Sequence, residues 1–195
     1  TKGLNRVYVL SFGDNVQINE LISQIKSNSA VELVERKRIR KIIVTPNDPS
    51  VGNQWFLSKV QAFAAWDIVI PSDTVKVAVV DNAIQTTHPD LAANMLPGYD
   101  ASDLDNDPNP PNDNFSHGTH VAGIVSAVTN NSIGIASAAN NRVKILPIKA
   151  TPDNGDPRGI YTGYEGIQWA IDNNADIISL SWGGGGYSQI EQDVI

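Results

Sequence analysis

Asp81 and His117 are the residues of this sequence whose types and settings best suit acid–base chemistry. Asp81 ends an apolar run, and His117 opens the string HGTHVAG. A carboxylate that binds one imidazole nitrogen fixes the ring tautomer, and the other nitrogen is then free to take a proton from a nucleophile. Taken singly, an acid at a strand end also serves as a turn cap and a lone histidine is commonly structural. The prediction of a catalytic pair therefore depends on the string around His117.

Zinc binding is a second interpretation of the histidines. His117 and His120 lie three residues apart, which places them on one turn of a helix. The sequence places no third ligand beside them, and the glutamate of the H-E-x-x-H pattern is missing. Zinc is therefore disfavoured.

A buried sheet must position these residues. Nearly continuous apolar runs predict strands over 75–80, 143–148 and 175–181. The segments between them predict helices over 118–128 and 157–172. Strands that alternate with helices predict an α/β fold, a parallel sheet with helices on both faces. In such sheets, functional groups gather beyond the carboxyl ends of the strands.

The segment 157–172 also carries signals for the start of its helix. Asp156 is expected to cap the first turn, and Pro157 suits the first helical position.

The first 45 residues predict a separate small α+β unit. Loose alternation predicts a strand over 6–12, helical spacing of apolar residues predicts a helix over 16–27, and 31–44 read as one or two strands. Proline and turn residues at 45–49 mark the boundary, so the predicted domains are 1–45 and 46–195. A short helix is expected over 55–67.

Composition and charge exclude several classes of protein. The chain has 195 residues and no cysteine, which excludes disulfides and thiol catalysis. No apolar run approaches the roughly 18 residues of a membrane span. Residues 1–45 carry eight Lys/Arg and four Asp/Glu, a net charge of +4. Residues 46–195 carry a net charge of −11, and the whole chain therefore carries −7. Such an acidic domain is expected to repel nucleic acid and anionic membranes.

Several segments together resemble the subtilisin-like serine proteases, the subtilases. The resemblance runs from about residue 46 to the end of the chain, and HGTHVAG after an Asp-ended strand is its strongest signal. The segments are VAVVDNAIQTTHPDL (77–91), SHGTHVAGIVSA (116–127), NNSIGIASAA (130–139), VKILPIKA (143–150) and GIQWAIDNNADIISLSWGG (166–184).

The resemblance implies roles for five residues. Asp81 corresponds to the acid that orients the base, and His117 to the general base. The stretch Ser181, Trp182 and Gly183 corresponds to the edge that pairs with an extended peptide substrate. The family's nucleophile motif, Gly-Thr-Ser-x-Ala, does not occur in these residues. The nucleophilic serine is therefore expected beyond residue 195, and this chain alone is expected to be inactive.

Two departures from the family pattern stand beside these residues. Asn82 and Ala83 follow the acid, where a small hydroxyl residue and glycine are usual. Trp182 stands where a smaller apolar residue is common, which is expected to reshape the substrate pocket.

Structural calcium is the cofactor that the resemblance implies. Related subtilases bind a tight calcium ion where this chain has Asp48, Asp90 and Asn131. A second, weaker site of thermitase-like members corresponds to the acidic loop at residues 100–107. That loop is equally well interpreted as a solvated acidic surface. Its candidate ligands are Asp100, Asp105 and Asp107.

Residues 1–45 resemble the end of a subtilase prosegment, which acts as chaperone and inhibitor of its own protease. Their +4 charge suits an acidic partner. The resemblance therefore implies a secreted, calcium-stabilised serine endopeptidase precursor that acts on peptides or proteins.

Two other functions stay open on the residues alone. A non-catalytic peptide-binding module would use the same glycine-rich edge without hydrolysis. A nucleotide-binding α/β domain is the other, but the GGGG run at 183–186 lacks the G-x-G-x-x-G spacing.

Overall fold

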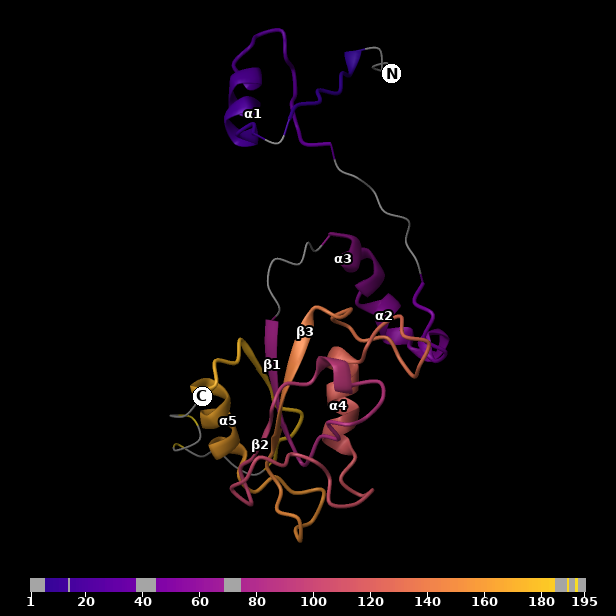
Figure 1. Ribbon diagram of the computed structural model, residues 1–195, viewed down its shortest axis with the longest axis vertical. Coiled ribbons are helices and arrows are strands. Elements are labelled where there is room, and N and C mark those ends of the chain that lie inside the picture. The colour runs from indigo at the N-terminus through magenta and orange to yellow at the C-terminus, as the bar shows by residue number, and fades with distance from the viewer. Residues whose placement is uncertain are drawn as a thin grey trace. The chain divides into compact units, whose positions relative to one another are not determined.

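Two units, Thr1–Ile42 and Ile43–Ile195, make up the chain (Figure 1). The predicted boundary between residues 45 and 46 lies close to this division. The computed structural model describes residues 6–13, 15–37, 45–68, 75–184, 189 and 192.

The first unit contains one described helix, α1 (Ile18–Lys26), which confirms the helix predicted over 16–27. The strand predicted over 6–12 is wrong, because these residues form none, and residues 31–37 form none either. Residues 38–44 of the second predicted strand lie outside the described residues. Val7, Tyr8, Val9 and Leu10 are 61–82% exposed. A strand needs partners and a buried face, which these described residues lack.

The second unit is built on a parallel sheet, as predicted, with four strands among the described residues. Three of them fall in the predicted apolar runs, whereas the short strand Tyr99–Asp100 was not predicted. Its strands are β1 (Val75–Asp81), β2 (Tyr99–Asp100), β3 (Val143–Lys149) and β4 (Ile177–Ser179), in the order β2-β3-β1-β4. The long central pair runs from Val75 opposite Val143 to Asp81 opposite Lys149. This register places two ionisable residues, Asp81 and Lys149, at the carboxyl ends of adjacent strands.

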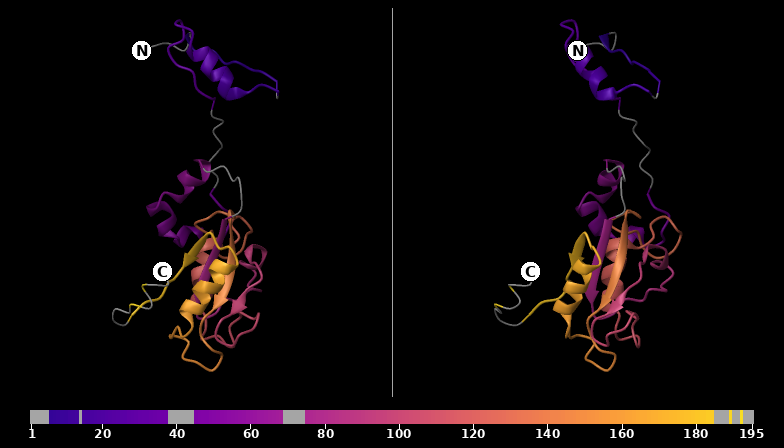
Figure 2. Two further views of the ribbon diagram at one scale, coloured as in Figure 1. Left: turned by 90° about the vertical axis from the view of Figure 1, so that its left-hand side faces the viewer. Right: turned by 60° about the vertical axis from the view of Figure 1, so that its left-hand side comes forward.

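Alternate residues of β1 face two different helices. Val77 and Val79 pack in one cluster with Ala122 of α4 (His117–Ser126), whereas Ala78 and Val80 pack in another with Ala170 of α5 (Gly163–Asp172). The helices accordingly lie on opposite faces of the sheet (Figures 1 and 2). Burial on both faces explains why β1 and β3 are nearly continuous apolar runs.

Two predicted helices differ from the observed ones. The helix predicted over 157–172 begins only at Gly163, because the Asp156 side chain binds the backbone N–H and guanidinium of Arg158 instead of capping a helix. The helix predicted over 55–67 is two helices, α2 (Trp55–Lys59) and α3 (Ala62–Ile68). Gln61 separates them with a φ of 57°, which no helix accommodates.

Short 3-10 turns complete the second unit at Val51–Asn53 and Ala92–Asn94. Among the described residues, no helix combines the length and apolar character needed to cross a bilayer.

Candidate active site

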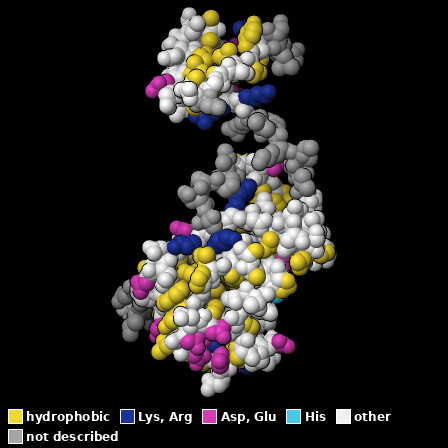
Figure 3. All heavy atoms as spheres, viewed as in Figure 1, with side chains coloured by type: hydrophobic (Ala, Val, Ile, Leu, Met, Phe, Trp, Pro, Cys, Tyr) yellow, Lys and Arg dark blue, Asp and Glu magenta, His cyan; other side chains and the backbone are white. Residues whose placement is uncertain are grey.

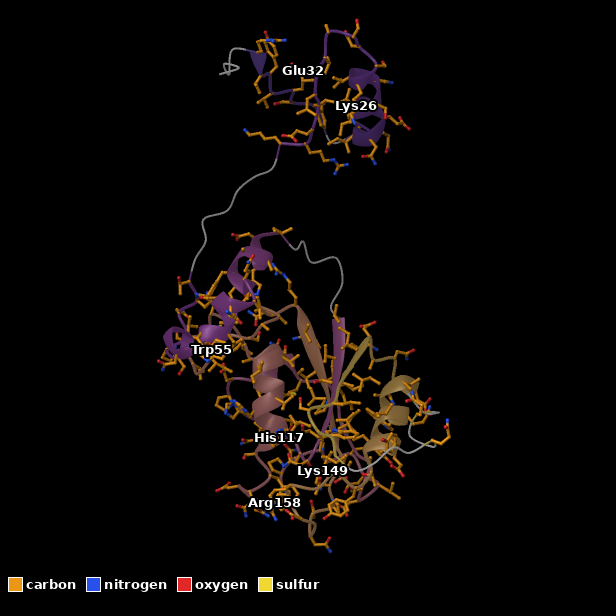
Figure 4. The ribbon with its side chains drawn as sticks, turned by 180° about the vertical axis from the view of Figure 1, so that it is seen from behind. Lys26, Glu32, Trp55, His117, Lys149 and Arg158 are labelled. Atoms are coloured by element: carbon orange, nitrogen blue, oxygen red, sulfur yellow. The ribbon has the colours of Figure 1, made fainter. Side chains whose placement is uncertain are left out.

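Asp81 and His117 meet at the carboxyl end of β1, as their pattern predicts. His117 Nδ1 lies 2.8 Å from Asp81 Oδ1. The Asp81 side chain is 1% exposed and that of His117 is 55% exposed. Figure 4 shows His117 at the start of α4, beside the strand ends. A buried acid thus holds one nitrogen of an imidazole whose ring still reaches solvent.

The close approach of α4 to β1 requires glycine at position 118. A Cβ atom there would lie 2.5 Å from the Ala83 carbonyl oxygen and 2.7 Å from Asp81 Cβ. Any larger residue would push the start of α4 away from the strand and carry His117 out of reach of Asp81. The glycine of the HGTHVAG string is therefore a geometric requirement of the pair.

One oxygen of Asp81 makes both of its described hydrogen bonds. Oδ1 accepts from His117 and from the backbone N–H of Asn82, the latter at 2.7 Å. Oδ2 is buried and has no partner among the described residues. The imidazole therefore depends on the position of a single carboxylate oxygen.

The predicted substrate stretch lies at the same end of β1. Trp182 Nε1 donates to the carbonyl oxygen of Val80 at 2.7 Å, next to Asp81. Its ring packs on Gly163, where a Cβ atom would lie 2.7 Å from it, and edge-on against Tyr164. The indole thus packs against the start of α5. A Cβ atom at Gly183 would meet nothing within 4 Å, so the backbone there is open.

A cluster that the sequence interpretation missed surrounds Lys149, at the end of β3. Its ammonium lies 2.5 Å from Asp100 and 3.3 Å from Asp103, and it also contacts Asp153. Lys149 and Asp100 are each 1% exposed. Acidic side chains gather at this end of the unit in Figure 3, and Figure 4 places Lys149 there. The available sequence signal was a lysine that directly follows the apolar run 143–148.

The acids of this cluster keep Lys149 charged. Burial alone lowers the pKa of the ammonium, but the hydrogen bonds that it donates to Asp100 and Asp153 outweigh burial and raise the pKa above its ordinary value. The hydrogen bond from the backbone N–H of Asp153 is the main cause that holds the pKa of Asp103 below its usual 3.8. The hydrogen bond from the Lys149 ammonium adds to this effect. The cluster is therefore an ion-pair network at neutral pH.

The residues of the first predicted calcium site come together around the loop 130–135. Asp48 and Asp90 are each 3% exposed. Asp48 accepts from the backbone N–H of Asn131 at 3.0 Å, and Asp90 accepts from the Asn131 side chain at 2.8 Å. No described Lys or Arg pairs with either acid. Two buried carboxylates without a described cationic partner are a donor set that fits a hard cation.

The residues of the second predicted site are arranged differently. Asp100 and Asp105 are joined through their backbones, and Asp105 Oδ1 accepts from the backbone N–H of Asp107. In the described part of the chain, the acidic group at metal-ligand spacing is instead Asp100, Asp103 and Asp153. Lys149 already supplies that group with a cation.

Neither His117 nor His120, the residues of the zinc interpretation, belongs to a group of side chains at metal-ligand spacing in the described part of the chain.

Comparisons with known proteins agree with this geometry. The model of the subtilase family matches residues 72–194. Thermitase of Thermoactinomyces vulgaris is 45% identical over 153 residues, which are 77% of this chain and 52% of that protein. Subtilisin E of Bacillus subtilis is 35% identical over 164 residues, 84% of this chain and 39% of that protein.

A solved protease structure from Pseudoalteromonas arctica is also similar. It superposes with a TM-score of 0.64 at 34% identity, over 77% of this chain and 55% of that chain. The chain thus spans about half or less of the length of these relatives. The family match covers the sheet, both histidines of HGTHVAG and the substrate stretch. The chain therefore belongs to the subtilase family of serine proteases.

Proposed function

We propose that this chain supplies the acid and the base of a subtilisin-like serine endopeptidase. The observation that carries the proposal is the 2.8 Å contact between the buried carboxylate of Asp81 and the half-exposed imidazole of His117. The nucleophilic serine is provided by sequence outside residues 1–195, so these residues alone do not hydrolyse peptides.

His117 acts as general base through its solvent-facing nitrogen, Nε2. It takes the hydroxyl proton of the serine as the oxygen attacks the peptide carbonyl, and it then gives that proton to the leaving amine. The acyl-enzyme is hydrolysed by the same proton transfers with water as the attacking group. Asp81 stays ionised and stabilises the imidazolium in both halves of the reaction. The open backbone of Ser181–Gly183 pairs with the extended substrate.

Asp48, Asp90 and Asn131 hold a structural calcium ion in this proposal. Their support is the pair of buried carboxylates, both hydrogen-bonded to Asn131, and the tightly turned loop that carries Asn131. Asn130 and Ser132 have φ values of 66°, and Gly134 has 47°. These turns let backbone carbonyls contribute further oxygen ligands. The ion would stabilise the fold and takes no part in the reaction.

Residues 1–45 act as the inhibitory prosegment of this protease, which is secreted. The support is their net +4 charge against −11 in the remainder. The support for secretion is that two related proteins, one from Dichelobacter nodosus and one from Xanthomonas campestris, are named extracellular proteases.

The test is peptide hydrolysis by the protein expressed from its complete reading frame. In subtilisin, loss of the catalytic histidine lowers kcat by about 10⁶-fold, and we expect a fall of that order in His117→Ala. His120→Ala is the matched control, because His120 lies on the same helix and is exposed. Its activity should equal that of the wild type.

Hydrolysis that survives His117→Ala would overturn the assignment. Peptide binding without hydrolysis in the wild type would favour a non-catalytic peptide-binding module, which the open backbone at Gly183 also suits.

A further inference from the structure

Asn82 joins the Asp81–His117 pair to the rest of the second unit. It is 3% exposed and follows Asp81 directly. Its Oδ1 accepts from the backbone N–H of Ala83 at 2.8 Å and of Gly118 at 3.0 Å. Its Nδ2 donates to the carbonyl oxygen of Pro157 at 2.8 Å. Two N–H groups face one side-chain atom and a carbonyl faces the other, so only this orientation of the amide satisfies all three bonds.

These bonds reach both members of the pair. The backbone N–H of Asn82 binds the same Asp81 oxygen that holds His117. Gly118 is the residue after His117, so the side-chain oxygen Oδ1 of Asn82 binds the first turn of α4. One side chain thus ties the end of β1 to the start of α4, and ties both to the loop that carries Pro157.

We propose that Asn82 is a positioning residue, which sets the distance and angle between Asp81 and His117. The inference rests on the proposed function, because this geometry matters for catalysis only if His117 is the base. No other common side chain of this size makes the three bonds. Leucine would leave two buried N–H groups and one carbonyl without partners, and aspartate would keep the acceptor but lose the donor to Pro157.

The experiment compares Asn82→Leu with Asn94→Leu in the protein expressed from its complete reading frame. Asn94 is a matched control, since it is 4% exposed and bonds the carbonyl of Ser126 and the ammonium of Lys144. Two readouts are measured. One is the steady-state kinetics, which show whether the substitution changes kcat or KM. The other is the NMR resonance of the Nδ1 proton of His117, assigned by its loss in His117→Gln.

We expect Asn82→Leu to lower kcat about tenfold or more with KM changed less than about twofold, because a buried bond of ordinary strength corresponds to that factor in rate. The Nδ1 resonance should broaden as its proton exchanges faster with water. Asn94→Leu should keep both the wild-type kcat and a sharp resonance, even if its unfolding midpoint falls equally.

Equal behaviour of the two leucine variants would overturn the positioning role. If Asn82→Leu does not fold, Asn82→Asp and Asn94→Asp replace the pair, and a wild-type kcat in Asn82→Asp would overturn the role in the same way. Asp81→Asn separates the two ideas. Unchanged hydrolysis in that variant refutes the proposed function, whereas a loss there with no effect at Asn82 refutes only the positioning role.

Discussion

Asp81 and Asp100 are two buried acids at the ends of β1 and β2, which β3 separates in the sheet, yet their partners differ. Each side chain is 1% exposed. The partner of Asp81 is His117, which is 55% exposed and makes one described ion pair. The partner of Asp100 is Lys149, which is 1% exposed and shared with two further acids.

Under the proposed function, this difference distinguishes a pair that transfers a proton from a cluster that does not. A base must exchange its proton with a substrate, so one face of it must be open and its charge must change near neutral pH, as imidazole does. A buried ammonium surrounded by acids keeps its charge and its place. The same register that pairs Asp81 with Lys149 across the sheet therefore sets a reactive pair beside a structural one.

After the loss of His117 itself, the largest expected effect comes from changing its acid partner. Asp81→Asn should lower kcat about 10⁴-fold, because an amide neither stabilises the imidazolium nor selects the tautomer that accepts a proton. The measurement is steady-state hydrolysis of a peptide substrate, with circular dichroism to confirm the fold. A fall of less than about tenfold would mean that Asp81 does not orient His117.

The structural pair should respond in stability instead of chemistry. Lys149→Met should lower the free energy of unfolding by about 3 kcal/mol at neutral pH, because it leaves Asp100 buried without its cation. Urea unfolding measures this. Lys144→Met is the control on the same strand, since the partners of Lys144 among the described residues are neutral oxygens, those of Ala93 and Asn94. Lys144→Met should lower the free energy of unfolding by about 1 kcal/mol or less.

The difference between Lys149→Met and wild type should also depend on pH. The pKa of Asp103 is held below 3.8 in the folded protein, so its contribution is complete above that pH and is lost as the pH falls through the lowered value. The difference in stability between the two proteins should therefore shrink as the pH falls through the lowered pKa of Asp103. A constant gap from pH 7 to pH 2 would contradict the ion-pair role.

Asp48 and Asp90 extend the comparison to buried acids without a described cationic side chain. We expect excess calcium to stabilise the wild type by about 3 kcal/mol at 100 times Kd, and Asp90→Asn to lose most of this gain. Thermal unfolding with calcium and with EGTA measures it. Asp67→Asn, on the exposed side of α3, should keep the full gain. An equal calcium effect in Asp90→Asn would refute the site.

The smallest expected effect concerns an exposed ion pair. Arg158 holds the pKa of Asp156 at about 2 through side-chain and backbone hydrogen bonds. Arg158→Ala should return this pKa toward 3.8, as NMR titration of the carboxyl would show, with little change in stability because the pair is solvated. A pKa that stays near 2 would mean that the loop backbone alone sets it.

The residue pattern alone predicted three of the four described strands and the pairing of Asp81 with His117. Strands β1 and β3 are apolar on both faces, and a strand buried on both faces requires such a run, so their position is readable without coordinates. Asp81 follows one of these runs, and the HGTHVAG string marks the helix that approaches it. Local pattern alone therefore locates both residues.

The partners of the other buried groups follow from tertiary packing. Lys149 meets Asp103 and Asp153, and Asn82 meets Gly118 and Pro157, through contacts that no periodicity encodes. Asp156 resembles a helix cap in the sequence, but a local bond to Arg158 wins over the helix start. Such choices depend on which groups the folded chain brings within about 3 Å, and that is a property of packing between distant segments.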